Sequence, residues 1–449
     1  MRKFVFLPLV FAGLVLAAAG QTPSQTPAAK AVYKTYSAAM SAGKKLSEAS
    51  KRADAVAAFE QAAALAKNDV QKADALIAAA KVQMDDSHTG MSGGKFKKSA
   101  HTVFHHPNAV RSLNTALDLP GIDDAKRAEI KIVRADVYFA ANKHIDAHNQ
   151  LVPDLEKQFG KEIRWIIRDE MTALAAAAST PPDRKAEALI MKARTYKNFL
   201  DKYANSADLK SAFDALNSAT MVAGAGDTVK AEAFLQIAEL ARVGYNSSIF
   251  VAAYESVIKL PKATPTQKYK AATDLAYALI VNDRIEPARK LLTEALTVPG
   301  LTVAERGGIH RVLSVSFVRE IHSKKPAKAA EDALMASARN ELELAAKQTK
   351  LKGDDLSEAY RKNGEFIRTF NDAICFRLAR EQLKAALAVP GITEREKARV
   401  QYELGETYRL ENKLPEAQAA YKLVTNANPQ YYGYAQRQIK DISSAKPGN

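Results

Sequence analysis

A short phrase that occurs three times constrains the fold of this chain more than any other feature of its sequence. In residues 116–123, 295–302 and 386–393, an apolar stretch that begins Ala-Leu runs into Pro-Gly and then into an Asp or Thr. The residue before proline is disfavoured in the α region, glycine adopts positive φ readily, and Asp or Thr caps a following helix. Each copy therefore ends one helix and begins another. Repetition of this kind predicts a stack of similar helical units and an all-α fold.

The expected helix starts support the same interpretation. Three of them have the capping-box form, in which a Thr is followed three residues later by Gln or Glu and the two groups bond reciprocally. The residue pairs are Thr264 and Gln267, Thr302 and Glu305, and Thr393 and Glu396. Pro265 also stands at a first helical position, where proline is tolerated.

Residues 1–20 have the composition of an export signal. Arg2 and Lys3 supply a charged start, residues 4–16 an apolar core, and residues 17–20 the small side chains that a signal peptidase requires. We therefore expect a bacterial protein that is exported to the periplasm or the extracellular space.

The rest of the chain has no second membrane signal. Residues 21–35 are polar and contain proline, which predicts a disordered linker. No later stretch approaches about 18 uncharged apolar residues, so no transmembrane segment is expected. Cys375 is the only cysteine, which excludes a disulfide within the chain.

The formal charge of the chain is +15, and it falls to +13 when Arg2 and Lys3 are removed with the signal. This charge is spread along the sequence and not concentrated in one arm. It favours acidic partners, whereas export argues against nucleic acid.

The last unit carries the clearest repeat motif. Its spaced residues are Leu404, Gly405, Tyr408, Ala417, Tyr421 and Pro429. This spacing resembles the tetratricopeptide repeat (TPR), a 34-residue pair of antiparallel helices with the pattern W-x2-L-G-x2-Y, A-x3-F and P. Gln401 replaces the tryptophan of that pattern, and Tyr421 replaces its phenylalanine. Small residues at Gly405 and Ala417 would let the two helices approach closely.

Related spacings recur upstream and define nine candidate units. Gly43 belongs to the first unit, and Ala276 and Ala288 belong to the sixth. The units start near Tyr36, Ala73, Ala128, Ala186, Ala231, Tyr269, Gly307, Tyr360 and Ala398. The unequal intervals between these starts predict insertions in the second, third, fourth and seventh units.

The resemblance covers residues 36–431, and residues 432–449 are expected to form a C-terminal capping helix and tail. It implies a right-handed superhelical solenoid whose first helices line a concave groove. Proteins of this family use such a groove to bind peptides or other proteins.

The predicted insertion in the second unit, residues 84–108, concentrates histidine and lysine. Its candidate partner-binding residues are Lys95, Lys97, Lys98, His101, His105 and His106. Insertions in repeat proteins often lie on the binding face. A mobile surface loop without a single function is the simpler interpretation of the same composition.

A metal site is a further hypothesis for the same region. Zinc or copper would be held by histidines of the insertion together with a pair spaced i,i+4. The additional candidates are His88, His144 and His148. No H-E-x-x-H geometry or paired carboxylate accompanies them, so no metal or other cofactor is expected.

Two single residues have structural interpretations. Cys375 lies among apolar residues and is expected to be a buried core residue. Trp165 lies on an extra helix between the third and fourth units, where packing is the expected role and Arg164 with Arg168 offers an alternative anion-binding face.

No phosphate-binding loop, nucleophile elbow or CxxC pair occurs in the sequence, which argues against an enzyme. The sequence therefore predicts a non-enzymatic exported scaffold that binds envelope or secreted proteins or peptides. The alternative is a module for anionic glycan or cell-wall polymer, based on the positive charge and the scattered tyrosines.

Overall fold

The computed structural model describes residues 32–85, 106–147, 163–196, 206–244, 246–347 and 351–444. These residues form nineteen helices and contain no strand. The helices of the N-terminal half are α1 (Tyr36–Glu48), α2 (Arg52–Leu65), α3 (Asp69–Asp85), α4 (His106–Leu117), α5 (Asp124–Ala147), α7 (Ile163–Ala176), α8 (Pro182–Arg194), α9 (Ser206–Thr220), α10 (Asp227–Val243) and α11 (Ser247–Lys259).

The helices of the C-terminal half are α12 (Pro265–Val281), α13 (Ile285–Leu296), α14 (Val303–Lys324), α15 (Lys328–Ala346), α16 (Gly353–Arg368), α17 (Ala373–Leu387), α18 (Glu394–Leu410), α19 (Leu414–Lys422) and α20 (Pro429–Ser444). The fold is all-α, as the sequence predicts.

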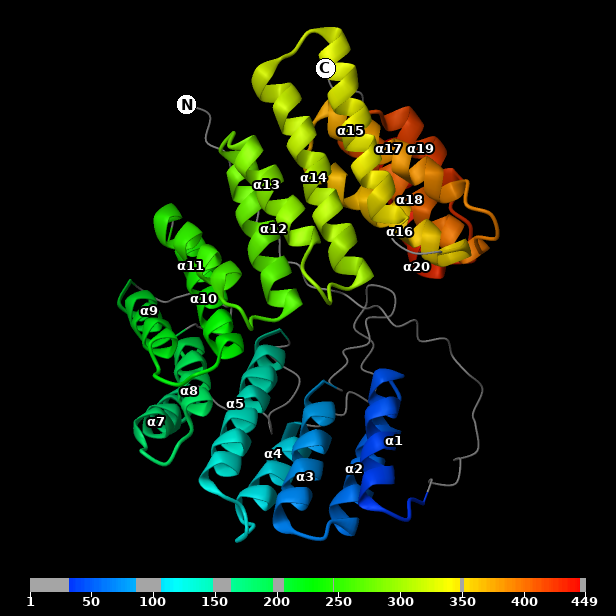
Figure 1. Ribbon diagram of the computed structural model, residues 1–449. Helices are drawn as coiled ribbons and strands as arrows, with labels where there is room; N and C mark the ends of the chain where they lie inside the picture. Colours follow the sequence, from blue (N-terminus) through cyan, green and yellow to red (C-terminus); the bar gives the residue numbers. More distant parts are fainter. Residues whose placement is uncertain are drawn as a thin grey trace.

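Successive helices pack as hairpins that follow one another along a curved row from α1 to α20 (Figure 1). Eight of the nine predicted units have both helices within the described ranges. The pairs are α1–α2, α3–α4, α8–α9, α10–α11, α12–α13, α14–α15, α16–α17 and α18–α19. Helix α5 is the first helix of the third unit, α7 is an extra helix that packs on α8, and α20 packs on α18 and α19.

A small buried residue sits at one register position in every first helix. These small positions are Gly43, Ala80, Ala135, Ala193, Ala238, Ala276, Ser314, Gly364 and Gly405. A Cβ atom built on Gly405 would lie 2.5 Å from Cε1 of Tyr421 on the second helix, and one on Gly43 would lie 2.6 Å from Cε1 of Phe59. The absence of a side chain therefore sets the distance between the two helices of these units.

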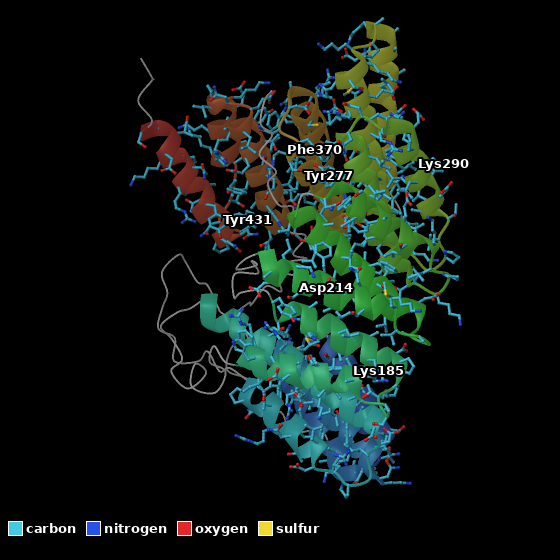
Figure 2. The ribbon with its side chains drawn as sticks, turned by 90° about the vertical axis from the view of Figure 1, so that its left-hand side faces the viewer. Lys185, Asp214, Tyr277, Lys290, Phe370 and Tyr431 are labelled. Carbon is cyan, nitrogen blue, oxygen red and sulfur yellow. The ribbon has the colours of Figure 1, made fainter. Side chains whose placement is uncertain are left out.

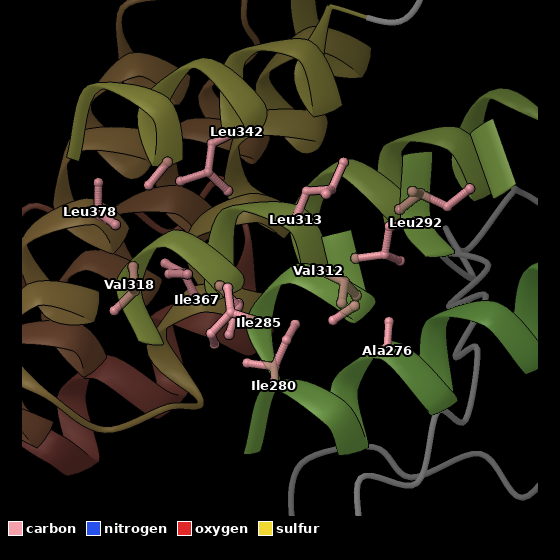
Figure 3. Close-up of a cluster of buried hydrophobic side chains, with 14 of the residues drawn as sticks. Ala276, Ile280, Ile285, Leu292, Val312, Leu313, Val318, Leu342, Ile367 and Leu378 are labelled. Carbon is pink, nitrogen blue, oxygen red and sulfur yellow. The ribbon is translucent and has the colours of Figure 1, made fainter. Parts of the chain in front are cut away.

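The core is divided among several clusters of buried side chains, most of which join helices of neighbouring units. One cluster of buried side chains joins Ala276 of α12, Leu292 of α13, Val312 of α14, Leu342 of α15 and Leu378 of α17 (Figure 3). Each unit thus buries its apolar surface against its neighbours, which is how a solenoid obtains stability without a central core.

The turns inside the hairpins use a residue in the left-handed region. Ser50, Asp283, Asn371 and Asn412 all have positive φ, and each follows the small position of its unit by seven residues. In the seventh unit the corresponding residue is Lys325, which follows Ser314 by eleven residues.

The predicted insertion of the seventh unit is therefore helical. Helix α14 has 22 residues and α15 has 19, compared with 17 and 12 in α12 and α13. Figure 1 shows α14 and α15 extending beyond the neighbouring hairpins.

The helix starts agree with the sequence in two cases of three. Thr264 and Thr302 form complete capping boxes. Thr393 accepts a hydrogen bond from the backbone of Glu396, but the Glu396 carboxylate instead accepts one from Nε of Arg361, at 3.0 Å. The third capping box is therefore incomplete, because a neighbouring unit competes for its glutamate.

The Pro-Gly phrases also differ among themselves. Gly300 and Gly391 have positive φ, as expected, but Gly121 does not. Its backbone N–H donates to Oδ2 of Asp69, the first residue of α3, at 2.7 Å.

Three boundaries differ from the sequence predictions. The C-terminal helix α20 begins at Pro429 instead of residue 432, α3 extends through Asp85, and α4 begins at His106. The second-unit insertion is thus shorter than residues 84–108. Residues 1–31, with the predicted export signal and most of the linker, lie outside the described ranges. Within those ranges, no helix has the length and apolar character needed to cross a bilayer.

Candidate groove along the first helices

Two positions of each first helix share one helix face from unit to unit, and several of the side chains there are buried, among them Ile132, Leu235 and Arg361. The two positions are the third residue before the small position and the first residue after it. These two residues are four apart in the sequence and therefore lie on the same helix face. We call them the inner positions. The earlier ones are Met40, Ile77, Ile132, Ile190, Leu235, Thr273, Arg311, Arg361 and Tyr402. The later ones are Lys44, Lys81, Asp136, Arg194, Glu239, Tyr277, Val315, Glu365 and Glu406.

At the N-terminal end these positions line an open cavity of about 420 Å³ between α1, α3 and α5. The lining residues are Tyr36, Ser37, Met40, Lys44, Asp74, Ile77, Ala78, Lys81 and Glu129. All of them belong to the first helices of three successive units. A volume of this order accommodates a short segment of another chain or a small ligand.

The cavity combines an apolar base with positive charge. Lys126 donates to Oδ1 of Asp74 and to Oε2 of Glu129, both at 2.7 Å. Burial opposes a charged amine there, but these two carboxylates raise the pKa of Lys126 above its ordinary value. Lys44 and Lys81 are exposed and form no ion pair with any residue that the structure describes.

In the middle units the charged inner residues have ion-pair partners. Arg194 Nη1 lies 2.5 Å from Oδ1 of Asp136, and Arg242 Nη2 lies 2.5 Å from Oε1 of Glu239. These groups already have partners of opposite charge, so this stretch offers little unpaired charge to a ligand.

The C-terminal units contain a buried network of ion pairs. Arg361 is fully buried, and its guanidinium pairs with Glu396 at 3.0 Å, with Glu358 at 3.3 Å and with Glu365. Arg368 Nη2 lies 2.8 Å from Oε2 of Glu403. Burial raises the pKa of both Glu396 and Glu403, and the facing arginines oppose this effect. The positive charge of Arg361 at this inner position is therefore neutralised by carboxylates of the same chain.

Aromatic contacts join first helices of different units. The rings of Tyr277 on α12 and Phe370 after α16 lie 5.9 Å apart, and Figure 2 shows them side by side. Tyr402 on α18 contacts Tyr431 at 5.2 Å and Tyr434 at 5.9 Å. Because both of those tyrosines belong to α20, the capping helix covers the last inner position.

The sequence-predicted packing residues lie between helices and do not line this surface. Gly43, Ala276, Ala288, Leu404, Gly405, Ala417 and Tyr421 are buried. Tyr408 is half-buried, and Pro429 is an exposed first residue of α20.

Most of the His- and Lys-rich insertion lies outside the described residues. Lys95, Lys97, Lys98, His88, His101, His105 and His148 lie outside the described residues. His106 starts α4 and is thus helical, contrary to its prediction as a loop residue, and His144 lies within α5. The part of the chain that the structure describes contains no group of three or more His, Cys, Asp or Glu arranged to hold a metal ion.

Cys375 is buried, as the sequence predicts, and burial raises the pKa of its thiol. The prediction for Trp165 is wrong, because this side chain is 60 % exposed. The Arg168 guanidinium lies over the Trp165 ring at 4.2 Å and over the Tyr196 ring at 4.0 Å. It also donates to the hydroxyl and carbonyl oxygens of Thr195, so Arg168 is engaged within the protein instead of forming a free anion-binding face.

No protein-family model matches the sequence, and no curated protein matches it either. Among solved structures, the chain is similar to the APC/C hetero-tetramer Cut9–Hcn1, with 13% identity over 91% of this chain and 76% of that chain and a TM-score of 0.30. It is also similar to the TPR domain of P58(IPK), with 15% identity over 92% and 99% of the two chains and a TM-score of 0.23. Yeast Tom70 gives 11% identity over 92% and 97% and a TM-score of 0.19.

The architecture is a solenoid of TPR-like helix pairs. The inner positions are candidate site residues that the sequence analysis did not single out. Counting back three residues and forward one residue from each small position identifies them, so the signal is present in the sequence once the register is known.

Proposed function

We propose that this protein is an exported, non-enzymatic scaffold that binds an extended segment of a partner protein in the groove of its first helices. The observation that carries the proposal is the cavity between α1, α3 and α5, which is lined only by first helices. Ion pairs and α20 occupy the equivalent positions at the C-terminal end. The N-terminal units therefore offer the open part of the groove.

The chemistry of the cavity supports a partner segment that is both apolar and acidic. Met40 and Ile77 form an apolar base. Lys44 and Lys81, which form no ion pair with the described residues, bring positive charge to its rim. A segment that combines apolar side chains with acidic ones would bury the former and pair with the latter. The export expected from residues 1–20 points to envelope or secreted proteins as its source.

Charge reversal at the rim tests the proposal. We expect the double variant K44E/K81E to capture at least about tenfold less of its protein partners from an envelope extract, because two attractive charges become repulsive. Both lysines are exposed, so folding should be unaffected. The matched control is K384E/K422E, which reverses two exposed lysines on the second helices α17 and α19.

Repeating the capture at high ionic strength distinguishes a protein partner from an anionic polymer. Retention of an anionic polymer should disappear, whereas a protein segment held also by apolar contacts should be retained in part. Equal capture by the two double variants would contradict the proposed groove.

A further inference from the structure

The ends of the stacked hairpins form two edges. At the loop edge each second helix is followed by the next first helix, and at the turn edge each first helix turns into its second helix. Four aspartates at the starts of first helices accept a hydrogen bond from a backbone N–H in the loop of the following unit. The pairs are Asp69 and Gly121, Asp183 and Gly226, Asp227 and Lys262, and Asp354 and Thr393, at 2.7, 2.6, 2.8 and 2.7 Å. Hydrogen bonds to a carboxylate are short and strong, so they fix the spacing of these units at the loop edge.

The joint between the fifth and sixth units is held firmly at this edge. Asp227 is the first residue of α10, and its Oδ2 accepts from the Lys262 N–H before α12. Thr228 donates from its hydroxyl to the Lys262 carbonyl oxygen at 3.2 Å, and Gln267 of α12 donates from Nε2 to the Thr228 carbonyl oxygen at 2.9 Å. These bonds fix the N-terminal ends of α10 and α12 relative to each other.

The turn edge of the same joint is different, because its polar groups bond within their own helices. Arg242 pairs with Glu239 of α10, and Asn282 donates from Nδ2 to a carbonyl oxygen of α12 at 2.8 Å. Val243 and Val281, the last residues of α10 and α12, are 50 % and 36 % exposed. Among the described residues, no hydrogen bond or ion pair joins the C-terminal ends of these two helices.

The C-terminal end of α12 is instead held by the units that follow it. Arg319 of α14 donates to both carboxylate oxygens of Asp283, at 2.7 and 2.9 Å, and to the Val281 carbonyl oxygen at 3.3 Å. The Tyr277 ring of α12 also contacts the Phe370 ring beyond α16 (Figure 2). The sixth to eighth units are therefore joined at the turn edge.

One further polar contact joins the fifth and sixth units. The Tyr254 hydroxyl of α11 donates to Oδ2 of Asp274 at 2.9 Å, halfway along α12. The other contacts across this joint are those of a cluster of buried apolar side chains. Apolar contacts are non-directional and allow packed helices to slide by small amounts, whereas hydrogen bonds fix both distance and direction.

We propose that the joint between α10 and α12 is a hinge whose pivot is the bond between Asp227 and Lys262. The sixth to eighth units swing about it as one body, and the displacement grows from the loop edge to the turn edge. The inner positions Glu239 and Tyr277 both lie near the C-terminal ends of their helices. The motion therefore changes the width of the groove between them, whichever ligand the groove holds.

Distances between pairs of nitroxide labels test the hinge without a ligand. In a Cys375→Ala background, labels at Val243 and Val281 report on the turn edge of the hinge. Labels at Val281 and the exposed Ser323 report on the turn edge of the next joint. We expect the distance distribution of the first pair to be at least about twice as wide as that of the second. Equal widths would overturn the proposal.

The variant Arg319→Ala releases the turn edge of the second joint. Arg319 and Asp283 are both partly exposed, so the fold should be retained. The distribution between residues 281 and 323 should widen to match that between residues 243 and 281, which should not change. If it stays narrow, Arg319 does not restrain the turn edge, and the contrast between the two joints on which the proposal depends is wrong.

A third pair of labels, at the exposed residues Ala223 and Lys262, locates the pivot on the loop edge. Its distribution should be narrow in wild type and in Asp227→Asn, which keeps a side-chain oxygen as acceptor. It should widen at least about twofold in Asp227→Ala, which removes the acceptor. A wide distribution in wild type, or a narrow one in folded Asp227→Ala, would show that the helices do not turn about this edge and would overturn the proposal. If Asp227→Ala does not fold, the wild-type widths of the three pairs still decide.

Discussion

Gly405 occupies a contact with no space for a side chain. Its missing Cβ would lie 2.5 Å from the Tyr421 ring, and the Tyr421 hydroxyl is held by Glu406. We expect Gly405→Leu to lower the free energy of unfolding by about 1–3 kcal/mol through overpacking, measured by denaturant titration. Gly433→Leu is the control, because nothing lies within 4 Å of its Cβ position. Equal stability of the two variants would contradict the assigned register.

The Glu320 carboxylate predicts a dependence of stability on acid. Although burial opposes ionisation, Lys324 and Arg289 hold its pKa below the ordinary 4.5. A lowered pKa in the folded state stabilises the protein fully above about pH 4.5 and progressively less as the pH falls below it. Stability should therefore fall between about pH 5 and 3, and less steeply in Glu320→Gln.

Asp214→Asn is the matched control for that measurement, since this exposed carboxylate pairs with exposed Lys210 on the same helix. It should retain the wild-type slope. If the free energy of unfolding of Glu320→Gln falls with pH as steeply as that of wild type, Glu320 does not contribute to the acid dependence of stability.

At this scale the sequence predicted positions within a unit better than contacts between units. The spacing from Gly405 to Tyr421 was readable because both residues belong to one hairpin. The Glu396 carboxylate was assigned to a capping box, but it pairs with Arg361 of the preceding unit. The surroundings of Arg361 likewise depend on a neighbouring first helix, which no local pattern encodes.

Helix α20 protects the last hairpin. Ala435 is buried, and Tyr431 and Tyr434 cover Tyr402 of α18. A chain that ends at Asn428 should show faster amide hydrogen exchange in α18 and α19, because their apolar surface loses its cover. Exchange in α1 to α3 should be unchanged, since each unit of a solenoid contacts mainly its neighbours. Faster exchange throughout the chain would contradict this local coupling.

The ends of helices followed from local chemistry where a cap or a turn determined them. Thr264 and Thr302 cap their helices as their sequences predict. The length of α14 could not be predicted from the sequence. An insertion that continues the helix produces the same interval between repeats as an insertion in a loop.

The single tryptophan makes it possible to follow one region of the whole molecule separately. Trp165 lies on α7, far along the chain from the last units, whereas circular dichroism averages over all helices. We expect Gly405→Leu to shift part of the circular dichroism unfolding transition to lower denaturant and to leave the tryptophan fluorescence transition in place. Identical shifts by both probes would show that the chain unfolds as one cooperative unit.

The overall architecture was predictable because every unit repeats the same local requirements. The open cavity at α1, α3 and α5 was not predictable, because its opening depends on which charged inner residues form ion pairs with other units. Sequence periodicity thus defines the scaffold, whereas the binding surface depends on the residues that vary between repeats.

The residues with positive φ that follow the first helices limit how such a chain can change in length. Four units place this residue seven positions after the small one, and the seventh unit adds four positions, close to one helical turn. Added residues that complete a turn leave the later side chains facing their original neighbours, whereas one added residue would rotate them by about 100°. First helices of this solenoid can therefore lengthen in steps of a turn, and a single-residue insertion between Gly405 and Asn412 would disrupt the hairpin more than an insertion of four.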